Sequence, residues 1–299
     1  MKAAYISWNP RGATQEVVIM ADQILEEYAE QGYDLTLRQL YYQFVARGYI
    51  PNKQSEYHKL GTIVNKARMA GYLRWDRIVD RTRNLQRLPT WSGPEGVVDT
   101  AARMYRRDLW KNQERYVEVW IEKEALVGVI EEMCDRHRVP YFACRGYVSQ
   151  SEMWSAAQRI MDTGKPTTIL HLGDHDPSGI DMSRDIIDRL GTFTRWRPDI
   201  RLTVNRLALN MDQIDYFNPP PNPAKLTDSR CEGYIAQYGE QSWELDAVSP
   251  KEMNELLRRE ISRLVDMKAW RKDDMQEEKD RAVLQWVSNN WDTVAEMVE

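Results

Sequence analysis

Apolar and polar residues alternate with a strand-then-helix rhythm through the middle of the chain. The stretch Thr168–Leu172 is largely apolar, Gly173 and Pro177 interrupt it, and apolar residues at helical spacing follow as far as Leu190. An earlier run, Tyr116–Ile121, alternates apolar and polar residues and also leads into a helical pattern. Both runs are predicted to be strands that are each followed by a helix.

Two further strands continue this order, at Val139–Cys144 and at Ile200–Leu209. Strands that alternate with helices are typical of a parallel sheet with helices on its faces. We therefore expect a mixed α/β fold for this part of the chain. A later helix is predicted to begin at the Ser249–Glu252 cap, and the charged tail carries an apolar stripe suited to packing or to a dimer contact.

The first eighty residues have a different and mainly helical pattern. Helical spacing predicts a helix over Thr14–Glu30, and Thr36–Gln39 has the form of a capping box that opens a helix over Leu37–Arg47. A turn leads to a basic helix, Ser55–Ala70, and Tyr72–Val79 is predicted to be a short strand or β-wing. Helix, turn, basic helix and ribbon form the outline of a winged helix-turn-helix.

The stretch Leu88–Gly96 is rich in proline, glycine and serine, as linkers are, and a helix is expected over Val97–Trp110. The chain of 299 residues is long enough for two cores. We predict a winged-helix domain over residues 1–95 and a sheet domain with a C-terminal helical extension over residues 96–299. An alternative boundary lies near position 110, to within about ten residues.

Charge divides the chain into a basic and an acidic part. From Thr36 to Leu88 there are eleven Lys or Arg against three acids, a local balance of +8, so that the rest carries −13 if the whole chain carries −5. A basic module joined to an acidic one suits a protein that holds phosphate with one part and metal with the other. Five basic side chains are candidate phosphate contacts: Lys59, Lys66, Arg68, Arg81 and Arg83.

Carboxylates stand at the ends of two predicted strands. Glu122 follows Tyr116–Ile121 directly, and Asp174 and Asp176 follow Thr168–Leu172. Because carboxyl ends of parallel strands meet at one edge of a sheet, these side chains are expected to share a pocket. Three carboxylates suit Mg²⁺ and phosphoryl chemistry. Taken alone, Asp174 and Asp176 are equally consistent with a solvent-exposed turn.

Other site classes find little support. The three cysteines match no disulfide framework, and Cys134 with His137 lacks the second pair that a zinc site needs. Gly164 and Lys165 do not form a phosphate-binding loop, since Arg159 and Pro166 occupy the critical positions. No apolar run is long enough to cross a bilayer, and we expect a cytoplasmic, intracellular protein without a membrane partner.

Five stretches together resemble the topoisomerase VI A subunit and the related meiotic double-strand-break transesterase. Leu37–Tyr42 is similar to the family's Arg-Asp-Ile-Tyr-Tyr motif, Val119–Ala125 to its Val-Glu-Lys-Glu-Ala stretch, and Asp174–Gly179 to its Asp-x-Asp-Pro-x-Gly. Lys225–Asp228 and Trp243–Ala247 resemble its closing portion. The resemblance covers most of the chain and implies a winged-helix domain followed by a Toprim domain.

The resemblance also implies roles for particular residues. Tyr42 would be the nucleophile that forms a 5′-phosphotyrosyl link to DNA, and Glu122, Asp174 and Asp176 would hold Mg²⁺. Arg38 lies four residues before Tyr42 on the same helical face, where it can hold the scissile phosphate or lower the pKa of the phenol. Double-stranded DNA would be the substrate, and a homodimer would cut both strands.

One departure from the family pattern is Gln39, which stands where the tyrosine motif usually has an aspartate. The chain is also shorter than the cellular A subunits, and it looks most like the compact, stand-alone Mini-A or topoisomerase VIII-type forms found on phages and mobile elements. This likeness implies no fused ATPase and leaves a separate ATPase subunit open.

Two other functions remain open on the sequence. One is a Toprim-type nuclease that activates water and forms no covalent link. The other is a winged-helix DNA-binding protein whose acids are structural. Without the motif, a helix tyrosine such as Tyr42 would most simply be a core residue, and this interpretation is kept for Tyr41.

Overall fold

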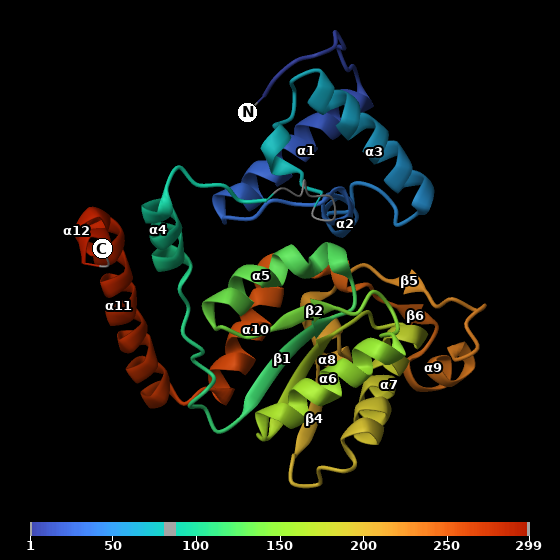
Figure 1. The fold of residues 1–299 in the computed structure, drawn as a ribbon. Helices are drawn as coiled ribbons and strands as arrows, with labels where there is room; N and C mark the ends of the chain where they lie inside the picture. Colours follow the sequence, from blue (N-terminus) through green and yellow to red (C-terminus); the bar gives the residue numbers. More distant parts are fainter. Residues whose placement is uncertain (1, 81–87, 298–299) are drawn as a thin grey trace.

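A four-stranded parallel sheet forms the centre of the molecule, which is described here by a computed structural model over residues 2–80 and 88–297. The strand order is β2-β1-β3-β4, and every neighbouring pair is parallel. The strands are β1 (Tyr116–Ile121), β2 (Tyr141–Ala143), β3 (Thr167–Leu172) and β4 (Leu202–Ala208). The prediction of a parallel α/β arrangement is confirmed (Figure 1).

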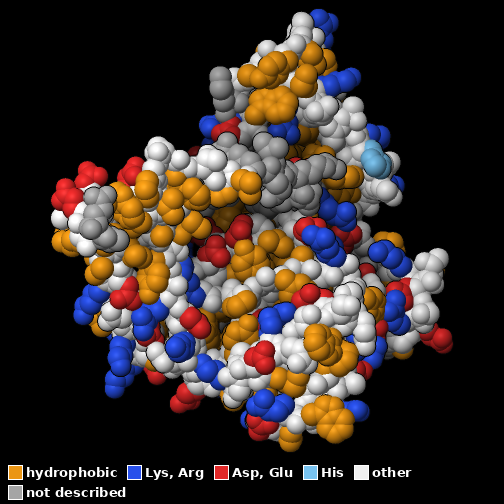
Figure 2. Space-filling view, viewed as in Figure 1, with side chains coloured by type: hydrophobic (Ala, Val, Ile, Leu, Met, Phe, Trp, Pro, Cys, Tyr) orange, Lys and Arg blue, Asp and Glu red, His pale blue; other side chains and the backbone are white. Residues whose placement is uncertain are grey.

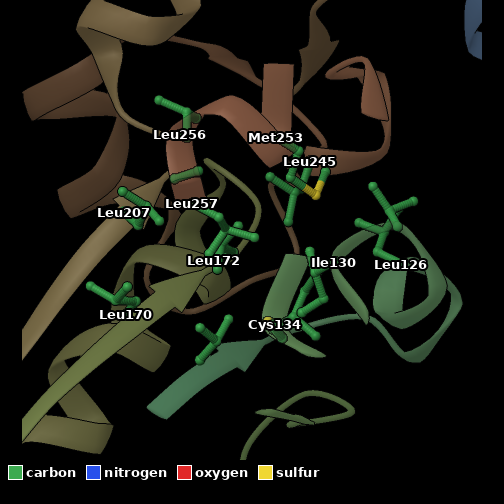
Figure 3. Packing of buried hydrophobic residues seen from close by; sticks show 14 of the residues in the cluster. Leu126, Ile130, Cys134, Leu170, Leu172, Leu207, Leu245, Met253, Leu256 and Leu257 are labelled. Atoms are coloured by element: carbon green, nitrogen blue, oxygen red, sulfur yellow. The ribbon is translucent and has the colours of Figure 1, made fainter. Parts of the chain in front are cut away.

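Helices cover both faces of this sheet because successive strand residues point to opposite sides. On β3, Leu170 and Leu172 belong to the core shared with α5 (Val127–Arg136) and α10 (Pro250–Leu264), as Figure 3 shows. Ile169 lies in the other core, against α6 (Gln150–Thr163) and α7 (Pro177–Thr194). Every residue of β3 is buried, which fits a central strand covered on both sides.

The N-terminal helices have a core of their own. They are α1 (Ala13–Glu30), α2 (Leu37–Ala46) and α3 (Gln54–Met69), close to the predicted bounds. The Thr36–Gln39 capping box is present at the start of α2: the Gln39 backbone N–H donates to Thr36 Oγ1 at 3.2 Å, and the Thr36 N–H donates to Gln39 Oε1 at 2.9 Å. The residue that departs from the family pattern therefore caps α2.

The predicted β-wing at Tyr72–Val79 is wrong in its secondary structure. This segment contains the 3₁₀ turn η1 (Trp75–Arg77) and a single-residue bridge between Ile78 and Leu35. The cause is Arg68, whose guanidinium donates to the carbonyl oxygens of Trp75 at 2.9 Å and Ile78 at 3.2 Å, so the chain folds back onto α3.

A helix near the C-terminus packs against a helix from the first third of the chain. Helix α4 (Pro94–Met104), shorter than the predicted Val97–Trp110, lies beside α11 (Met267–Asn289) to form an arm at the side of the molecule (Figure 1). Hydrophobic side chains are visible over this arm in Figure 2. The predicted boundary at residues 95 and 96 falls in the first turn of α4 and stays a prediction.

Short elements complete the chain. They are η2 (Glu124–Leu126), α8 (Met211–Phe217), β5 (Asn222–Pro223), α9 (Cys231–Tyr238), β6 (Gln241–Ser242), η3 (Leu245–Ala247) and α12 (Trp291–Glu296). Strands β5 and β6 form an antiparallel pair, in which Asn222 lies opposite Ser242 and Pro223 opposite Gln241. Among the described residues, no helix combines the length and the apolar character that crossing a bilayer requires.

Loss of the α2 cap tests how firmly the helix that carries Tyr42 is held. Thr36→Ala should lower the free energy of unfolding by about 1 kcal/mol, because one N–H at the start of α2 loses its acceptor. Urea unfolding followed by circular dichroism measures the change. Thr192→Ala, in the exposed part of α7, is the matched control and should lower stability by no more than about 0.5 kcal/mol. Equal losses in both variants would contradict the role of the cap.

Candidate functional site

The three predicted acids meet at the carboxyl ends of the two central strands. Glu122 follows β1, and Asp174 and Asp176 follow β3. The backbone N–H of Asp174 donates to Glu122 Oε2 at 2.8 Å, which ties the two strand ends together. Asp176 is the N-cap of α7, where its Oδ1 accepts from the Gly179 N–H at 2.7 Å. The three acids therefore lie at one edge of the sheet, and we refer to them as the acidic pocket.

Gly179 makes this tight loop possible. A Cβ added at this position would lie 2.2 Å from the carbonyl oxygen of Asp174, closer than any real contact. The glycine of the Asp-x-Asp-Pro-x-Gly stretch is thus required by close backbone approach rather than by an unusual dihedral angle. It allows α7 to begin directly against the acidic loop.

Burial and mutual repulsion disfavour the charged forms of these acids. Burial and the nearby Asp174 carboxylate raise the pKa of Glu122 above its usual range. Burial also raises the pKa of Asp174, and this effect exceeds the opposing effect of the Lys123 ammonium group. A bound cation would favour the charged forms of both groups.

Arg206 on β4 supports the acidic loop from behind. Its guanidinium donates to the carbonyl oxygens of Asp174 at 2.6 Å, Gly179 at 2.8 Å and Gly173 at 3.2 Å. Burial lowers the pKa of Arg206. Sequence reasoning missed this residue, although an arginine within a predicted strand was the available signal.

A segment far along the chain, Trp243–Ala247, lies against the acidic loop. The Leu245 N–H donates to Asp174 Oδ1 at 2.8 Å. The backbones of His175 and Trp243 exchange two hydrogen bonds, of 2.8 and 2.9 Å. The likeness of Trp243–Ala247 to the family's closing portion was noted from the sequence, but no functional role for it was predicted.

Lys123 joins that segment to the acids. Its Nζ lies 2.8 Å from Asp174 Oδ2, 2.7 Å from Asp246 Oδ2 and 3.1 Å from Glu244 Oε2. Burial would lower the pKa of Lys123, but the three negative charges outweigh it and raise the pKa. Lys123 directly follows Glu122 in the sequence, and both side chains belong to one charged cluster.

Helix α2 meets the same cluster. The Arg38 guanidinium donates to Glu244 Oε2, and its Nε lies 3.6 Å from Asp246 Oδ2. Burial would raise the pKa of Glu244, but the charges of Lys123 and Arg38 outweigh it and lower the pKa to about 2. Arg38, Glu244, Lys123 and Asp174 therefore form a continuous chain of ion pairs from α2 to the acidic loop.

Tyr42 lies on α2 beside Arg38, whose guanidinium carbon is 5.9 Å from the centre of its ring. Its side chain is buried, with 3% of the residue exposed. Burial and the charge of Glu244 raise the pKa of Tyr42 and outweigh the opposing effect of Arg38. The phenol is therefore protonated at neutral pH in this conformation.

A pocket of about 340 Å³ opens between α2, α3 and the β5 segment. Its lining includes Arg38, Tyr42, Lys53, His58 and Glu244. Cationic, aromatic and polar groups thus surround the space beside the candidate nucleophile. This pocket could hold a phosphate ester next to Tyr42, once the Arg38 guanidinium exchanged the Glu244 carboxylate for the phosphate.

Tyr41 has a structural environment, as expected. Its hydroxyl donates to Asn52 Oδ1 at 2.9 Å, and its ring packs edge-on against those of Tyr42 and Tyr57. The Asn52 amide in turn donates to Asn222 Oδ1 at 2.6 Å. Tyr41 therefore helps to attach the turn before α3 to the β5 segment.

The candidate phosphate contacts differ in availability. Lys59 and Lys66 are exposed on α3, with Lys59 Nζ 2.6 Å from Glu56 Oε1. Arg68 is a correction, because its guanidinium is hydrogen-bonded to two carbonyl oxygens and stacked 4.5 Å from the Trp75 ring centre. Arg81 and Arg83 lie outside the described residues. Figure 2 shows Lys and Arg side chains near the junction of the N-terminal helices and the sheet domain.

The donor chemistry of the pocket fits a hard divalent cation, although its present arrangement is not that of a formed metal site. Across residues 2–80 and 88–297, no three His, Cys, Asp or Glu side chains are grouped closely enough to hold a metal ion. Both Asp174 oxygens are bound by the protein, to Leu245 N and Lys123 Nζ. The close carboxylates and the raised pKa of Glu122 are the features that a cation would relieve.

Comparison with protein-family models, curated proteins and solved structures finds no match to this chain. Function is therefore inferred from the residues and their geometry.

The raised pKa of Glu122 gives a pH test. Its carboxyl binds a proton more tightly in the folded than in the unfolded chain, where the pKa is about 4.3. Wild-type stability should therefore fall as the pH rises from that value through the raised folded pKa. Glu122→Gln carries no such charge and should be more stable than wild type at pH 8 by about 1–3 kcal/mol in chelator, with little difference at pH 4.

Urea unfolding at pH 4, 6 and 8 measures this difference. Glu232→Gln, on the exposed side of α9, is the control and should follow the wild-type curve. A constant difference between Glu122→Gln and wild type at all three pH values would show that Glu122 is not under electrostatic strain.

Proposed function

We propose that this protein is a DNA-cleaving transesterase resembling the type IIB topoisomerases, in which Tyr42 attacks the DNA backbone beside an acidic, cation-binding pocket. The observation that carries the proposal is the ion-pair chain from Arg38 through Glu244 and Lys123 to Asp174. It brings a tyrosine and an arginine from the N-terminal helices to the edge of the sheet where three carboxylates meet.

Arg38 is the proposed phosphate ligand. Its guanidinium is about half exposed and lies beside Tyr42, and it presents donors suited to two phosphate oxygens. In the absence of DNA these donors are taken by Glu244. A phosphate that displaces Glu244 would bring its phosphorus toward the phenol and would weaken the negative field that keeps the phenol protonated.

The proposed step is an exchange of phosphoesters. The bond between Tyr42 Oη and phosphorus forms as the bond between phosphorus and the 3′ oxygen breaks. The phenol loses one proton and the 3′ oxygen gains one, so no net proton is released. The products are a 5′-phosphotyrosyl link and a free 3′ hydroxyl, and the similar energy of the two esters permits resealing.

The acidic pocket is the proposed site of Mg²⁺, held by Glu122, Asp174 and Asp176. A divalent cation bound there supplies positive charge for the phosphate and the leaving 3′ oxygen. The protein's own contribution is the position of these carboxylates, which the Asp176 cap of α7 and the Arg206 hydrogen bonds to the loop backbone hold in place.

Double-stranded DNA is the proposed substrate and a homodimer the proposed active form, with Lys59 and Lys66 of α3 as backbone contacts. A winged-helix role for the N-terminal helices and a Toprim role for the sheet are part of the same proposal. The local balance of +8 over residues 36–88 supports contact with a polyanion. A separate ATPase subunit would be a further partner.

A second candidate is a cation-dependent nuclease that uses water in place of Tyr42. The burial of the tyrosine and its raised pKa favour this candidate, because both make the phenol a poor nucleophile until the site rearranges. The same acidic pocket would serve both reactions.

Covalent capture distinguishes these two functions. The purified protein is incubated with end-labelled duplex DNA and Mg²⁺, denatured, and analysed with and without protease. Wild type should leave protein on 5′ ends, and Tyr42→Phe should reduce this adduct at least about a thousandfold. Tyr41→Phe is the matched control and should keep at least about a tenth of the wild-type adduct. Free 5′ phosphates from both wild type and Tyr42→Phe would replace the transesterase with the nuclease.

Removal of the acids tests whether the protein is only a DNA-binding protein. Asp174→Asn with Asp176→Asn should abolish cleavage while leaving DNA affinity, measured by fluorescence anisotropy in chelator, within about threefold of wild type. The control is Asp185→Asn with Asp188→Asn. These two residues lie within α7, away from the acidic loop, and the double variant should retain cleavage. Absence of any cleavage by wild type, with intact DNA binding, would favour a non-catalytic role.

A further inference from the structure

Lys123 lies among carboxylates in a way that is typical of a bound cation. Its ammonium group is within 2.7–3.1 Å of oxygens from Asp174, Glu244 and Asp246, which come from two distant segments of the chain. A lysine has three N–H donors, and these three carboxylates can accept all of them. The Asp246 side chain is 1% exposed, so its charge depends on near neighbours rather than on water.

The surrounding charges make a cation necessary at this place. Glu122 accepts from the Asp174 N–H and is affected by the charges of Asp174 and Asp176, whereas Glu244 and Asp246 meet Asp174 at the Lys123 ammonium group. Carboxylates gathered in this way repel each other unless positive charge lies between them. Lys123 supplies that charge between Asp174 and the Glu244–Asp246 pair, whereas Arg206 bonds only to carbonyl and hydroxyl oxygens.

An unsatisfied oxygen points to the same place independently. Asp246 Oδ1 is buried and has no hydrogen-bond partner among the described residues, although Asp246 Oδ2 is bound by Lys123. A buried carboxylate oxygen without a donor is costly. It is a ready ligand for a cation that binds with both oxygens of one carboxylate.

We propose that the Lys123 ammonium group occupies a second cation position, between Asp174 and the Glu244–Asp246 pair. The five carboxylates would bind two divalent cations without Lys123, and with Lys123 they bind one. This inference rests on the proposed cation-dependent function and defines its stoichiometry. The divalent ion belongs to Glu122, Asp174 and Asp176, and Lys123 provides a permanent charge that links this pocket to Arg38 through Glu244.

The test counts Mn²⁺ ions on the full-length protein without DNA, by electron paramagnetic resonance of the free ion during titration. Wild type should bind one ion per chain. Lys123→Met should bind two, because the vacated position keeps its carboxylates. Lys123→Arg keeps a cation and should bind one. Two ions on wild type, or one ion on a folded Lys123→Met protein, would overturn the proposal.

Two further variants locate the second ion and cover the case in which Lys123→Met does not fold. Adding Glu244→Gln and Asp246→Asn to Lys123→Met should return the count to one. The same two changes in a chain that keeps Lys123 should leave one ion, with Mn²⁺ affinity within about threefold of wild type. Loss of that ion would overturn the separation of the two positions.

The outcome is independent of the cleavage assay. A change from one ion to two without any covalent DNA adduct would support the role of Lys123 while removing the transesterase. Absence of Mn²⁺ binding by wild type would overturn this inference together with the proposed cation-dependent chemistry.

Discussion

The contact between the Glu244 carboxylate and the two cations Arg38 and Lys123 holds the candidate site together. Glu244 accepts from Arg38 on α2 and lies 3.1 Å from Lys123 after β1. Without it, Arg38 and Lys123 would share only the Asp246 carboxylate, whose Oδ2 lies 3.6 Å from Arg38 Nε and 2.7 Å from Lys123 Nζ. The position of Tyr42 relative to the acids therefore depends on this carboxylate. An ion pair among partly buried groups is sensitive to the arrival of a competing anion, as a DNA phosphate would be.

The rest of the site is a compromise between packing acids closely and keeping them charged. Burial raises the pKa values of Glu122 and Asp174, and the fold offsets this with Lys123. Arg206 adds rigidity through carbonyl oxygens without pairing directly with a carboxylate. Gly179 allows the backbone to turn within 2.2 Å of where a side chain would otherwise stand. These features give a loop that is prepared for positive charge.

The sequence predicted the elements whose signals are local. Alternation along β1 and the apolar run of β3 located two central strands, the acids that follow these strands were expected at one edge of the sheet, and the Thr36–Gln39 pattern located the start of α2. These features depend on residues within about ten positions of one another.

Features set by distant contacts were not predictable in the same way. The Trp243–Ala247 segment reaches Asp174 across about seventy residues, and Arg38 reaches Glu244 across about two hundred. The β-wing prediction failed because the Arg68 guanidinium holds Trp75 and Ile78 against α3. The carbonyl oxygens of these residues accept from Arg68 and not from a neighbouring strand. Arg68 was also taken for a phosphate contact, since its charge is visible in the sequence and its hydrogen bonds are not.

The central claim is that a tyrosine of α2 becomes joined to DNA, and mass spectrometry of the reacted protein tests it most directly. After incubation with duplex DNA and Mg²⁺, exhaustive nuclease treatment and proteolysis, a short nucleotide should remain attached to the peptide that contains residues 39–47. Fragmentation should place it on Tyr42 and not on the neighbouring Tyr41. A nucleotide on another residue, or cleaved DNA with no modified peptide, would contradict the account.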